Sequence, residues 1–372
     1  MQKLKSVVKN TLFVTIPFFI VILFVLELFT RLTWDKKQGV PGLVLTHPVR
    51  IEVLAPNYKG YYAGQPLKIN NLGFRDNQDY SFEKGNNTFR IIVLGDSVTF
   101  GHGCKFEETW PFLLKQNLVK WNNKVKWEVW NLGVPGYDSN LELKTLEEIG
   151  PKAEPDLVIV GFYENDLIAW DYHPKQKMPG IIYKVKSFLK KKFYLYTKMR
   201  FAFNVITNLR VADKTQCEYE TQLLSMPDNE IEKTDLSNFR FKHIAQNTPL
   251  PPISDRRYSH SKKEAIISLE KDIAQFKNYH AKDVYNVIFF INIAPDIDKK
   301  NDCFIDGIHN DMNNFFLSLL NNETKAVSSY NAFWCYKPSE VPGASEHSLA
   351  EANLVKADVL FNFLIKNEFN YN

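Results

Sequence analysis

The chain has 372 residues, of which 45% are hydrophobic and 24% are charged, and its formal net charge is +4. This ordinary composition excludes collagen-like, intrinsically disordered and disulfide-scaffold proteins, and the small, dispersed charge argues against nucleic acid as a partner. The length suits one large domain or two ordinary ones.

The first predicted element is an apolar segment at residues 11–30, which follows a short tail at residues 1–10. Its length approaches the roughly 20 apolar residues that cross a bilayer core. It is longer than the usual hydrophobic core of a cleaved signal peptide, and no small-x-small cleavage site follows it. We therefore predict an uncleaved, single-pass membrane anchor, with a cleaved signal peptide or a buried core helix as the alternatives.

Basic residues flank this segment on both sides: Lys3, Lys5 and Lys9 before it, and Arg31, Lys36 and Lys37 after it. The positive-inside rule therefore favours a cytoplasmic N-terminus only weakly. Because the leader is short and residues 31–372 all follow the segment, we predict that the C-terminal domain lies on the extracytoplasmic side, periplasmic or extracellular.

A turn-rich lead-in at residues 31–84 precedes an alternation of apolar, strand-like runs with helical patterns. The predicted strands are residues 90–94, 127–130, 157–161, 287–293 and 326–329. The predicted helices are residues 107–121, 141–149, 262–276 and 312–320, with a last helix carrying Leu354, Ala357, Phe361 and Leu364 on one face. This alternation predicts a parallel, doubly wound α/β sheet, in which ligands bind at the carboxyl ends of the strands.

The alternation is interrupted at about residues 171–260, so we predict one domain at residues 85–372 that contains an insertion. Residues 183–210 within the insertion are basic and aromatic. This pattern is typical of an amphipathic helix that lies on an anionic membrane surface or covers the site, and equally of a solvated helix with one packed face.

Helix starts and cysteines add further expectations. Ser139, Ser261 and Ser348 are each followed three residues later by Glu, which predicts capping boxes.

The cysteines are Cys104, Cys217, Cys303 and Cys335. Their spacing is not that of a metal site, so no metal is expected; Cys303 with Cys335 is the first candidate disulfide, and ordinary buried thiols are the alternative.

Ser97 is the candidate nucleophile. The tripeptide Gly95-Asp96-Ser97 directly follows a predicted strand and precedes a helix. A nucleophilic serine needs exposure at a sharp turn, a base within hydrogen-bond reach and donors for the oxyanion, and the glycine and the strand end supply the first of these. A serine that only caps the helix is the alternative.

Three more groups fall at strand ends or loops on the same predicted edge of the sheet. The glycine loop at residues 131–137 contains Gly136, Asn165 follows the next strand, and His347 comes just before the last helix. Because the carboxyl ends of parallel strands meet at one edge, these groups are predicted to converge on Ser97.

The segments GDSVTFG (95–101), NLGVPGY (131–137) and YENDL (163–167), with the late histidine, resemble blocks I, II, III and V of the SGNH/GDSL hydrolase superfamily. The resemblance covers about residues 66–366 without the insertion, and KINNLGFR (68–75) is similar to the lead-in of membrane-anchored bacterial members. It implies a three-layer, flavodoxin-like fold, a shallow open site, and neither metal nor cofactor.

The resemblance also implies a role for each matching residue. Ser97 is the expected nucleophile, and the oxyanion hole combines the backbone N–H groups of Ser97 and Gly136 with the side chain of Asn165. His347 is the expected base, which activates Ser97 and then protonates the leaving alcohol.

The sequence departs from the family pattern just before His347. Family members carry Asp three or two residues before the histidine, where this chain has Ala344 and Ser345. We therefore predict a Ser–His dyad. Glu346 is the candidate for an orienting carboxylate, and Glu340, a carboxylate from elsewhere or a backbone carbonyl remain open.

A second histidine, His309, matches the residue types of the family's Asp-x-x-His motif better than His347 does, but it lies at a different position in the chain order. Asp306-Gly-Ile-His309 reads Asp-x-x-His, yet it precedes a predicted helix and strand, whereas the base is expected to open the last helix.

His102, close to block I, is expected to be a local turn residue. Block III of the family commonly reads Gly-x-Asn-Asp, whereas Glu164 precedes Asn165 here, and its bulk is expected to narrow the oxyanion hole or shape the acyl pocket.

The predicted function is hydrolysis of a carboxylic ester, an acyl or acetyl group on an envelope glycan or lipid. An O-acyltransferase that uses the same Ser–His pair is one alternative. The other is a catalytically degenerate domain that binds envelope components, because the usual carboxylate is absent.

Overall fold

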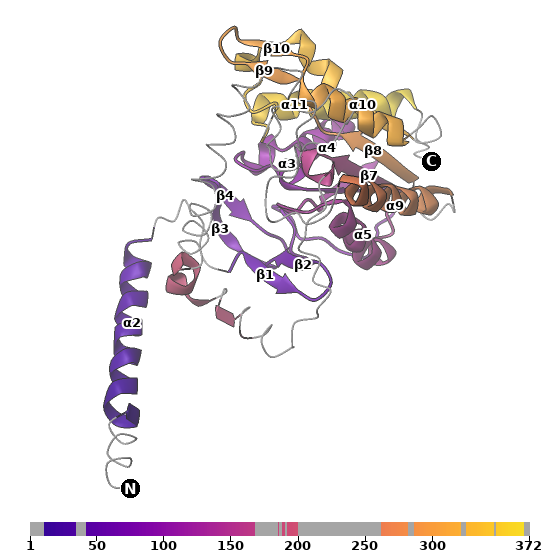
Figure 1. The fold of residues 1–372 in the computed structure, drawn as a ribbon. Coiled ribbons are helices and arrows are strands. Elements are labelled where there is room, and N and C mark those ends of the chain that lie inside the picture. Colours follow the sequence, from indigo (N-terminus) through magenta and orange to yellow (C-terminus); the bar gives the residue numbers. More distant parts are fainter. Residues whose placement is uncertain are drawn as a thin grey trace.

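The computed structural model describes residues 11–34, 42–167, 262–281, 286–320, 325–345 and 347–367, together with Val185, Phe188, Leu189 and residues 192–199 of the insertion. Residues 13–32 form one continuous apolar helical stretch, in which a π-helical turn (Thr11–Thr15) leads into α2 (Ile16–Leu32). Figure 1 shows α2 projecting away from the central sheet and its covering helices.

The centre of the fold is a five-stranded parallel sheet in the order β11-β8-β7-β5-β6. Its strands are β5 (Thr88–Gly95), β6 (Lys126–Asn131), β7 (Leu157–Phe162), β8 (Asn286–Ile291) and β11 (Ala326–Ser328). The predicted α/β class and all five predicted strands are confirmed. The chain runs from β5 outward to β6 and then returns to β7 on the other side of β5, so the topology switches beside β5, where a ligand site is expected.

Helices cover both faces of the sheet (Figure 1). One face packs on α5 (Ser139–Ala153), α9 (Lys262–Ala281) and α10 (Ile308–Leu320), and the other packs on α4 (Trp110–Trp121) and α11 (Ala350–Lys366). Alternate residues of each strand enter opposite cores, as the two-residue period of a strand requires: Ile92 and Leu94 of β5 on one side, Ile91 and Val93 on the other.

The lead-in contains more regular structure than its sequence indicates. Two hairpins form, β1 (Val44–His47) with β2 (Ile51–Leu54) and β3 (Lys59–Tyr62) with β4 (Gln65–Lys68). Strands this short have too few residues for an alternating pattern to be recognised. Leu54 and Leu67 are buried in the same core as α5, so the lead-in packs on the sheet domain. A third hairpin joins β9 (Asp296–Asp298) to β10 (Cys303–Ile305).

The predicted capping boxes at Ser139 and Ser348 are wrong. Asp138 caps α5, since its carboxylate accepts the N–H of Leu141 at 3.0 Å. Leu349 precedes α11 without a side-chain cap, because the Ser348 hydroxyl is engaged elsewhere. Ser261 lies outside the described residues.

The proposed disulfide is not formed in this structure. Cys303 and Cys335 are both free and exposed, and Cys104 is free and buried. Cys217 lies outside the described residues.

Candidate active site

Ser97 stands at the turn from the central strand β5 into the short helix α3 (Ser97–Phe100). Gly95 adopts φ +155°, and a Cβ there would come within 2.1 Å of Thr99 Oγ1, so only glycine fits the turn. Asp96 caps α3 by accepting the Val98 N–H at 2.8 Å. The strand, the glycine and the cap together hold the Ser97 hydroxyl at the carboxyl edge of the sheet.

His347 reaches this hydroxyl from the other end of the chain. Its Nε2 lies 2.9 Å from Ser97 Oγ, which is hydrogen-bond distance. The His347 side chain is exposed and Ser97 is half-buried, so the pair faces an open surface. This arrangement lets the imidazole take a proton from the hydroxyl when an ester carbonyl is attacked.

Several hydrogen bonds hold the loop that carries His347. Tyr163 donates its hydroxyl to the Ser345 carbonyl at 3.1 Å. From α11, the Asn353 amide donates to the Ser348 carbonyl at 3.1 Å and the Lys356 ammonium donates to Ser348 Oγ at 2.6 Å. The residues on both sides of His347 are thus held by β7 and α11.

The same loop contains the two positions at which an aspartate was expected. Ala344 is fully buried in an apolar cluster with Phe333 and Val341, and Ser345 is bonded to the Pro295 carbonyl. Both positions therefore serve packing of the loop. Glu346, the candidate orienting carboxylate, lies outside the described residues, so its role stays a prediction.

His102 lies against His347 and is more than a local turn residue. The two rings are 4.2 Å apart at their centroids and inclined by 31°. Burial, together with the charges of His347 and Arg75, lowers the pKa of His102 to about 4. His102 is therefore neutral near pH 7 and packs on the candidate base without adding a second positive charge.

Arg75 fixes the turn between α3 and His102. Arg75 is 2% exposed, and its guanidinium donates to the carbonyls of Phe100 at 3.1 Å and Cys104 at 2.6 Å, and also to that of Gly101. Arg75 belongs to the lead-in motif at residues 68–75, which was the only sequence signal for this role.

The predicted oxyanion groups lie around one loop. Gly136 has φ +82°, and no heavy atom stands within 4 Å of the position a Cβ would take, so its backbone borders open space. The Asn165 amide donates to the Tyr137 carbonyl, which ties Asn165 to the same loop. Because a side-chain amide has two N–H donors, the second can serve an oxyanion. No observation tests these roles, which remain predictions.

Two carboxyl groups are buried beneath this loop. Neither oxygen of Glu142 has a hydrogen-bond partner, and one oxygen of Asp166 accepts the Tyr163 N–H at 2.9 Å. Burial raises the pKa of Glu142 well above its ordinary value, and the charge of Asp166 raises it further. Burial likewise raises the pKa of Asp166. Asp166 thus binds the backbone N–H of Tyr163.

His309 occupies a different environment from His347. Its Nδ1 lies 3.5 Å from Asp296 Oδ1 and its Nε2 lies 3.7 Å from Glu164 Oε2. Burial acts to lower the pKa of His309, but the hydrogen bond with Glu164 and the charge of Asp296 outweigh it, so the pKa is raised. Two neighbouring carboxylates favour the protonated form of His309, and both of its ring nitrogens lie next to these carboxylates.

Lys356 is a buried cation close to the pair. Its side chain is fully buried and bonds Ser348, and the nearest charge that favours its protonated form is Asp96. Burial lowers the pKa of Lys356 to about 7 and raises that of Asp96 to about 6. The site therefore contains a lysine whose charge changes near neutral pH.

This lysine predicts a pH dependence of stability. With a folded pKa of about 7 against 10.5 in the unfolded chain, the unfolded state binds more protons between these values, so stability rises with pH. Between pH 7 and 9.5 this contribution is roughly 3 kcal/mol. Urea unfolding in detergent solution should show that Lys356→Met lacks this rise; parallel pH curves for both proteins would contradict the assignment.

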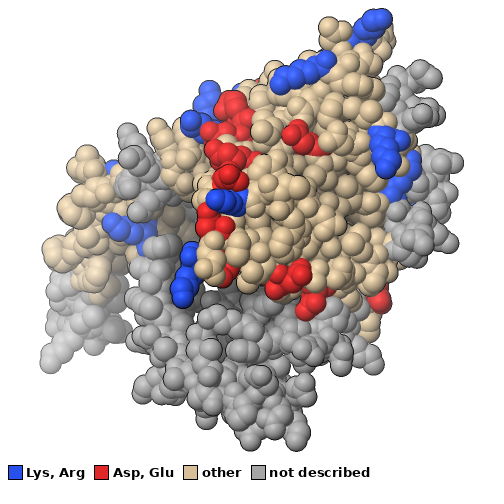
Figure 2. All heavy atoms as spheres, turned by 90° about the horizontal axis from the view of Figure 1, so that it is seen from above, with Lys and Arg blue, Asp and Glu red and all other residues tan. Residues whose placement is uncertain are grey.

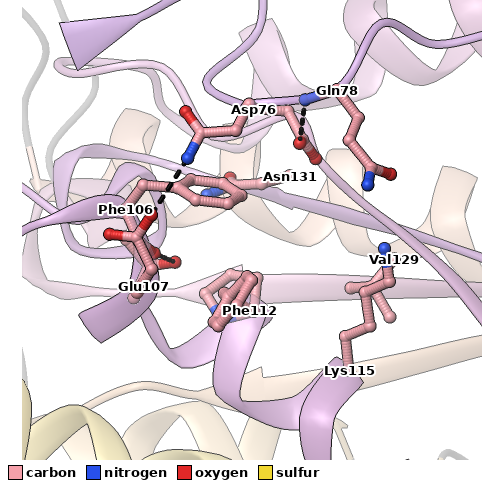
Figure 3. A pocket seen from close by; sticks show the side chains of 11 residues that line it. Asp76, Gln78, Phe106, Glu107, Phe112, Lys115, Val129 and Asn131 are labelled. Carbon is pink, nitrogen blue, oxygen red and sulfur yellow. Dashed lines mark hydrogen bonds between the residues drawn. The ribbon is translucent and has the colours of Figure 1, made fainter. Parts of the chain in front are cut away.

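A cavity of about 140 Å³ lies away from the Ser97–His347 pair, beside β6 and α4. Figure 3 shows Asp76, Glu107, Phe112 and Lys115 around it, with the Gln78 N–H bound to Asp76. Neither Ser97 nor His347 lines this cavity. The Ser97–His347 pair thus lies at an exposed surface and not in this cavity.

Among the described residues, no group of three or more His, Cys, Asp and Glu side chains is arranged to hold a metal ion. The chemistry available at Ser97 from the groups described is therefore that of a hydroxyl, an imidazole and backbone or amide donors.

No family model and no curated protein sequence matches the chain. Solved structures do match. The lipase Lip_vut3 from a goat rumen metagenome is 13% identical, with a TM-score of 0.41 over 74% of this chain and 97% of its own. The α/β hydrolase LAE5 from the Lake Arreo metagenome is 13% identical, with a TM-score of 0.39 over 78% and 99%. A lipolytic G-D-S-L family protein from Veillonella parvula is 11% identical, with a TM-score of 0.36 over 75% and 99%. At these values the matches are likenesses of fold, and the function has to be argued from the site.

Proposed function

We propose that the chain is a serine esterase of the SGNH/GDSL kind, which hydrolyses a carboxylic ester through Ser97 and His347. The observation that carries the proposal is the 2.9 Å separation between Ser97 Oγ and His347 Nε2, joining residues that are far apart in the sequence. Nucleophile and base within hydrogen-bond reach are the minimum that acyl transfer through a serine requires.

The mechanism follows from these positions. His347 Nε2 takes the hydroxyl proton as Ser97 Oγ attacks the ester carbonyl, and the negative charge on the carbonyl oxygen is stabilised by the N–H groups of Ser97 and Gly136 and the Asn165 amide. The imidazolium then gives its proton to the leaving alcohol. Water attacks the resulting acyl-Ser97 with His347 again as the base, which releases the acid and the free serine.

The loop contacts support a dyad without the usual carboxylate. A carboxylate in this kind of site holds the imidazole in the productive orientation. Here Ser345 and Ser348, on either side of His347, are held by hydrogen bonds from Tyr163, Asn353 and Lys356, and the ring packs on His102. We attribute to this packing and bonding the orienting part of the carboxylate's role.

The substrate proposed is an acyl or acetyl group on an envelope glycan or lipid. The open, shallow position of the pair suits an ester on a large molecule. A cavity of about 50 Å³ next to the Gly136 loop is lined by Tyr62, Phe100 and Pro135 among others, and neither Ser97 nor His347 lines it; we propose that a short acyl group on Ser97 extends over this loop towards it.

Membrane attachment belongs to the same proposal. The most apolar window within residues 13–32 has a mean hydropathy of 2.5, and only 6% of that window is buried against the rest of the protein. At a rise of 1.5 Å per residue this stretch is about 30 Å long, the thickness of a bilayer core. We place the catalytic domain on the extracytoplasmic side.

Activity-based labelling tests the proposal. Full-length protein in detergent micelles should react with a fluorophosphonate, with the adduct on Ser97 by mass spectrometry, because only an activated serine reacts. It should hydrolyse p-nitrophenyl acetate faster than the butyrate and octanoate esters.

Other outcomes would support one of the alternative functions or refute the assignment of Ser97. An unlabelled protein is the result expected of a degenerate binding domain, and an adduct at another serine would refute the assignment of Ser97. A burst of nitrophenol followed by slow turnover, accelerated by added glycan, would favour an O-acyltransferase over an esterase.

A further inference from the structure

The C-terminal end of α2 makes specific contacts with the insertion. Glu27 of α2 accepts the backbone N–H groups of Tyr194 at 3.1 Å and Leu195 at 2.8 Å. These N–H groups open a helical turn at residues 194–199. The carboxylate thus binds the positive end of that turn.

Arg31, one turn further along α2, completes the contact. Its guanidinium pairs with Glu27 at 2.7 Å, donates to the Lys192 carbonyl at 2.6 Å and lies 4.8 Å from the centre of the Tyr194 ring. Trp34 packs edge-on against Tyr194, with ring centroids 5.3 Å apart. The end of α2 and residues 192–199 therefore form one unit, defined here as the collar.

The collar buries a charged side chain, whereas the rest of α2 leaves most of its apolar side chains exposed. Most apolar side chains of α2 are exposed, whereas the Glu27 side chain is only 12% exposed. An ionised carboxylate is costly at membrane depth unless it is paired, and Glu27 has a guanidinium and two N–H partners. The contact is therefore one that a membrane environment would favour.

The described residues of the insertion expose apolar side chains and include lysines. Phe188 and Met199 are 56% and 62% exposed, and Phe188 packs against Phe193 with ring centroids 5.9 Å apart. Lys192 and Lys198 lie in the same short stretch. Exposed apolar rings with lysines, next to a Trp–Tyr pair at the end of an apolar helix, are typical of a membrane–water interface.

The distance from Glu27 to the end of α2 also agrees with a position at the membrane–water interface. Glu27 precedes the end of α2 at Leu32 by five residues, which is about 8 Å along a helix axis. Interfacial helices insert about 5–10 Å into the boundary between headgroups and acyl chains. By contrast, the face seen from above in Figure 2, away from α2, carries acidic and basic side chains together, as a solvated surface does.

We infer that residues 192–199 form a second, interfacial contact with the lipid bilayer, which Glu27 and Arg31 attach to the end of the anchor. This inference rests on the anchor of the proposed function, but not on the esterase activity. It requires that α2 remain in the mature protein, since a removed leader cannot contribute Glu27. The collar then holds the catalytic domain close to the membrane surface.

The test uses full-length protein in liposomes that contain anionic lipid. Met199→Cys carries an environment-sensitive fluorophore, with Cys217, Cys303 and Cys335 changed to Ser; the control label is on native Cys303, an exposed residue of β10. Brominated lipids should quench the label at residue 199 at least about threefold more than the label at residue 303. Equal quenching at both sites would overturn the inference.

Variants of Glu27 test the attachment itself. Glu27→Ala should reduce quenching at residue 199 towards the control value, and Glu27→Gln, which keeps one acceptor oxygen, should give an intermediate value. Quenching unchanged in Glu27→Ala would refute the attachment, and an unchanged circular dichroism spectrum reports that each variant is folded. An intact mass lacking residues 1–34 would also overturn the inference while leaving the esterase proposal untouched.

Discussion

Ser97→Ala is expected to lower kcat for p-nitrophenyl acetate by at least about 10³-fold, because it removes the hydroxyl on which the proposed acyl-enzyme forms. The residual rate comes from binding and oxyanion stabilisation alone, so KM should change little. Steady-state kinetics of the full-length protein measure both values, and fluorophosphonate labelling should disappear in parallel.

Ser318→Ala is the matched control. Ser318 is an exposed serine of α10 whose hydroxyl only bonds the Phe315 carbonyl, so its loss should leave rate and labelling within about twofold of wild type. Labelling that persists in Ser97→Ala would mean that another serine reacts, and the proposed chemistry would then have to be abandoned.

His347→Ala and His309→Ala are expected to separate two histidines that the sequence alone presents as rivals. His347→Ala removes the group 2.9 Å from Ser97 Oγ and should lower kcat/KM by about 10³-fold or more. His309→Ala removes a partner of Asp296 and Glu164 and should cost roughly 1–3 kcal/mol of stability while keeping kcat/KM within about tenfold.

The two measurements have to be made on the same preparations. Urea unfolding gives the stability of each variant, and hydrolysis of p-nitrophenyl acetate gives kcat/KM. The reverse pattern, with a large rate loss in His309→Ala and a small one in His347→Ala, would move the base to His309. That outcome would require a rearrangement, because His309 is enclosed by two carboxylates in this structure.

The contacts around His347 could not have been predicted from local sequence. The sequence pointed to His347 through chain order, since a base at the start of the last helix follows the last strand. It left the orienting group open and treated His102 as a local turn residue. The contact between the His102 and His347 rings and the bond from Lys356 to Ser348 join residues whose separation depends on how α3 and α11 pack.

The sequence by itself determined the α/β class, the strands and helices of the sheet domain, and the presence of one long apolar N-terminal helix, because hydrophobic periodicity over several residues is a local property. The short hairpins of the lead-in could not be predicted from hydrophobic periodicity, because their strands have too few residues to show a period. Only the tertiary structure decided that His347 and not His309 lies beside Ser97, and that Glu27 meets Tyr194 across the insertion. Such contacts depend on the packing of distant elements, which no local pattern encodes.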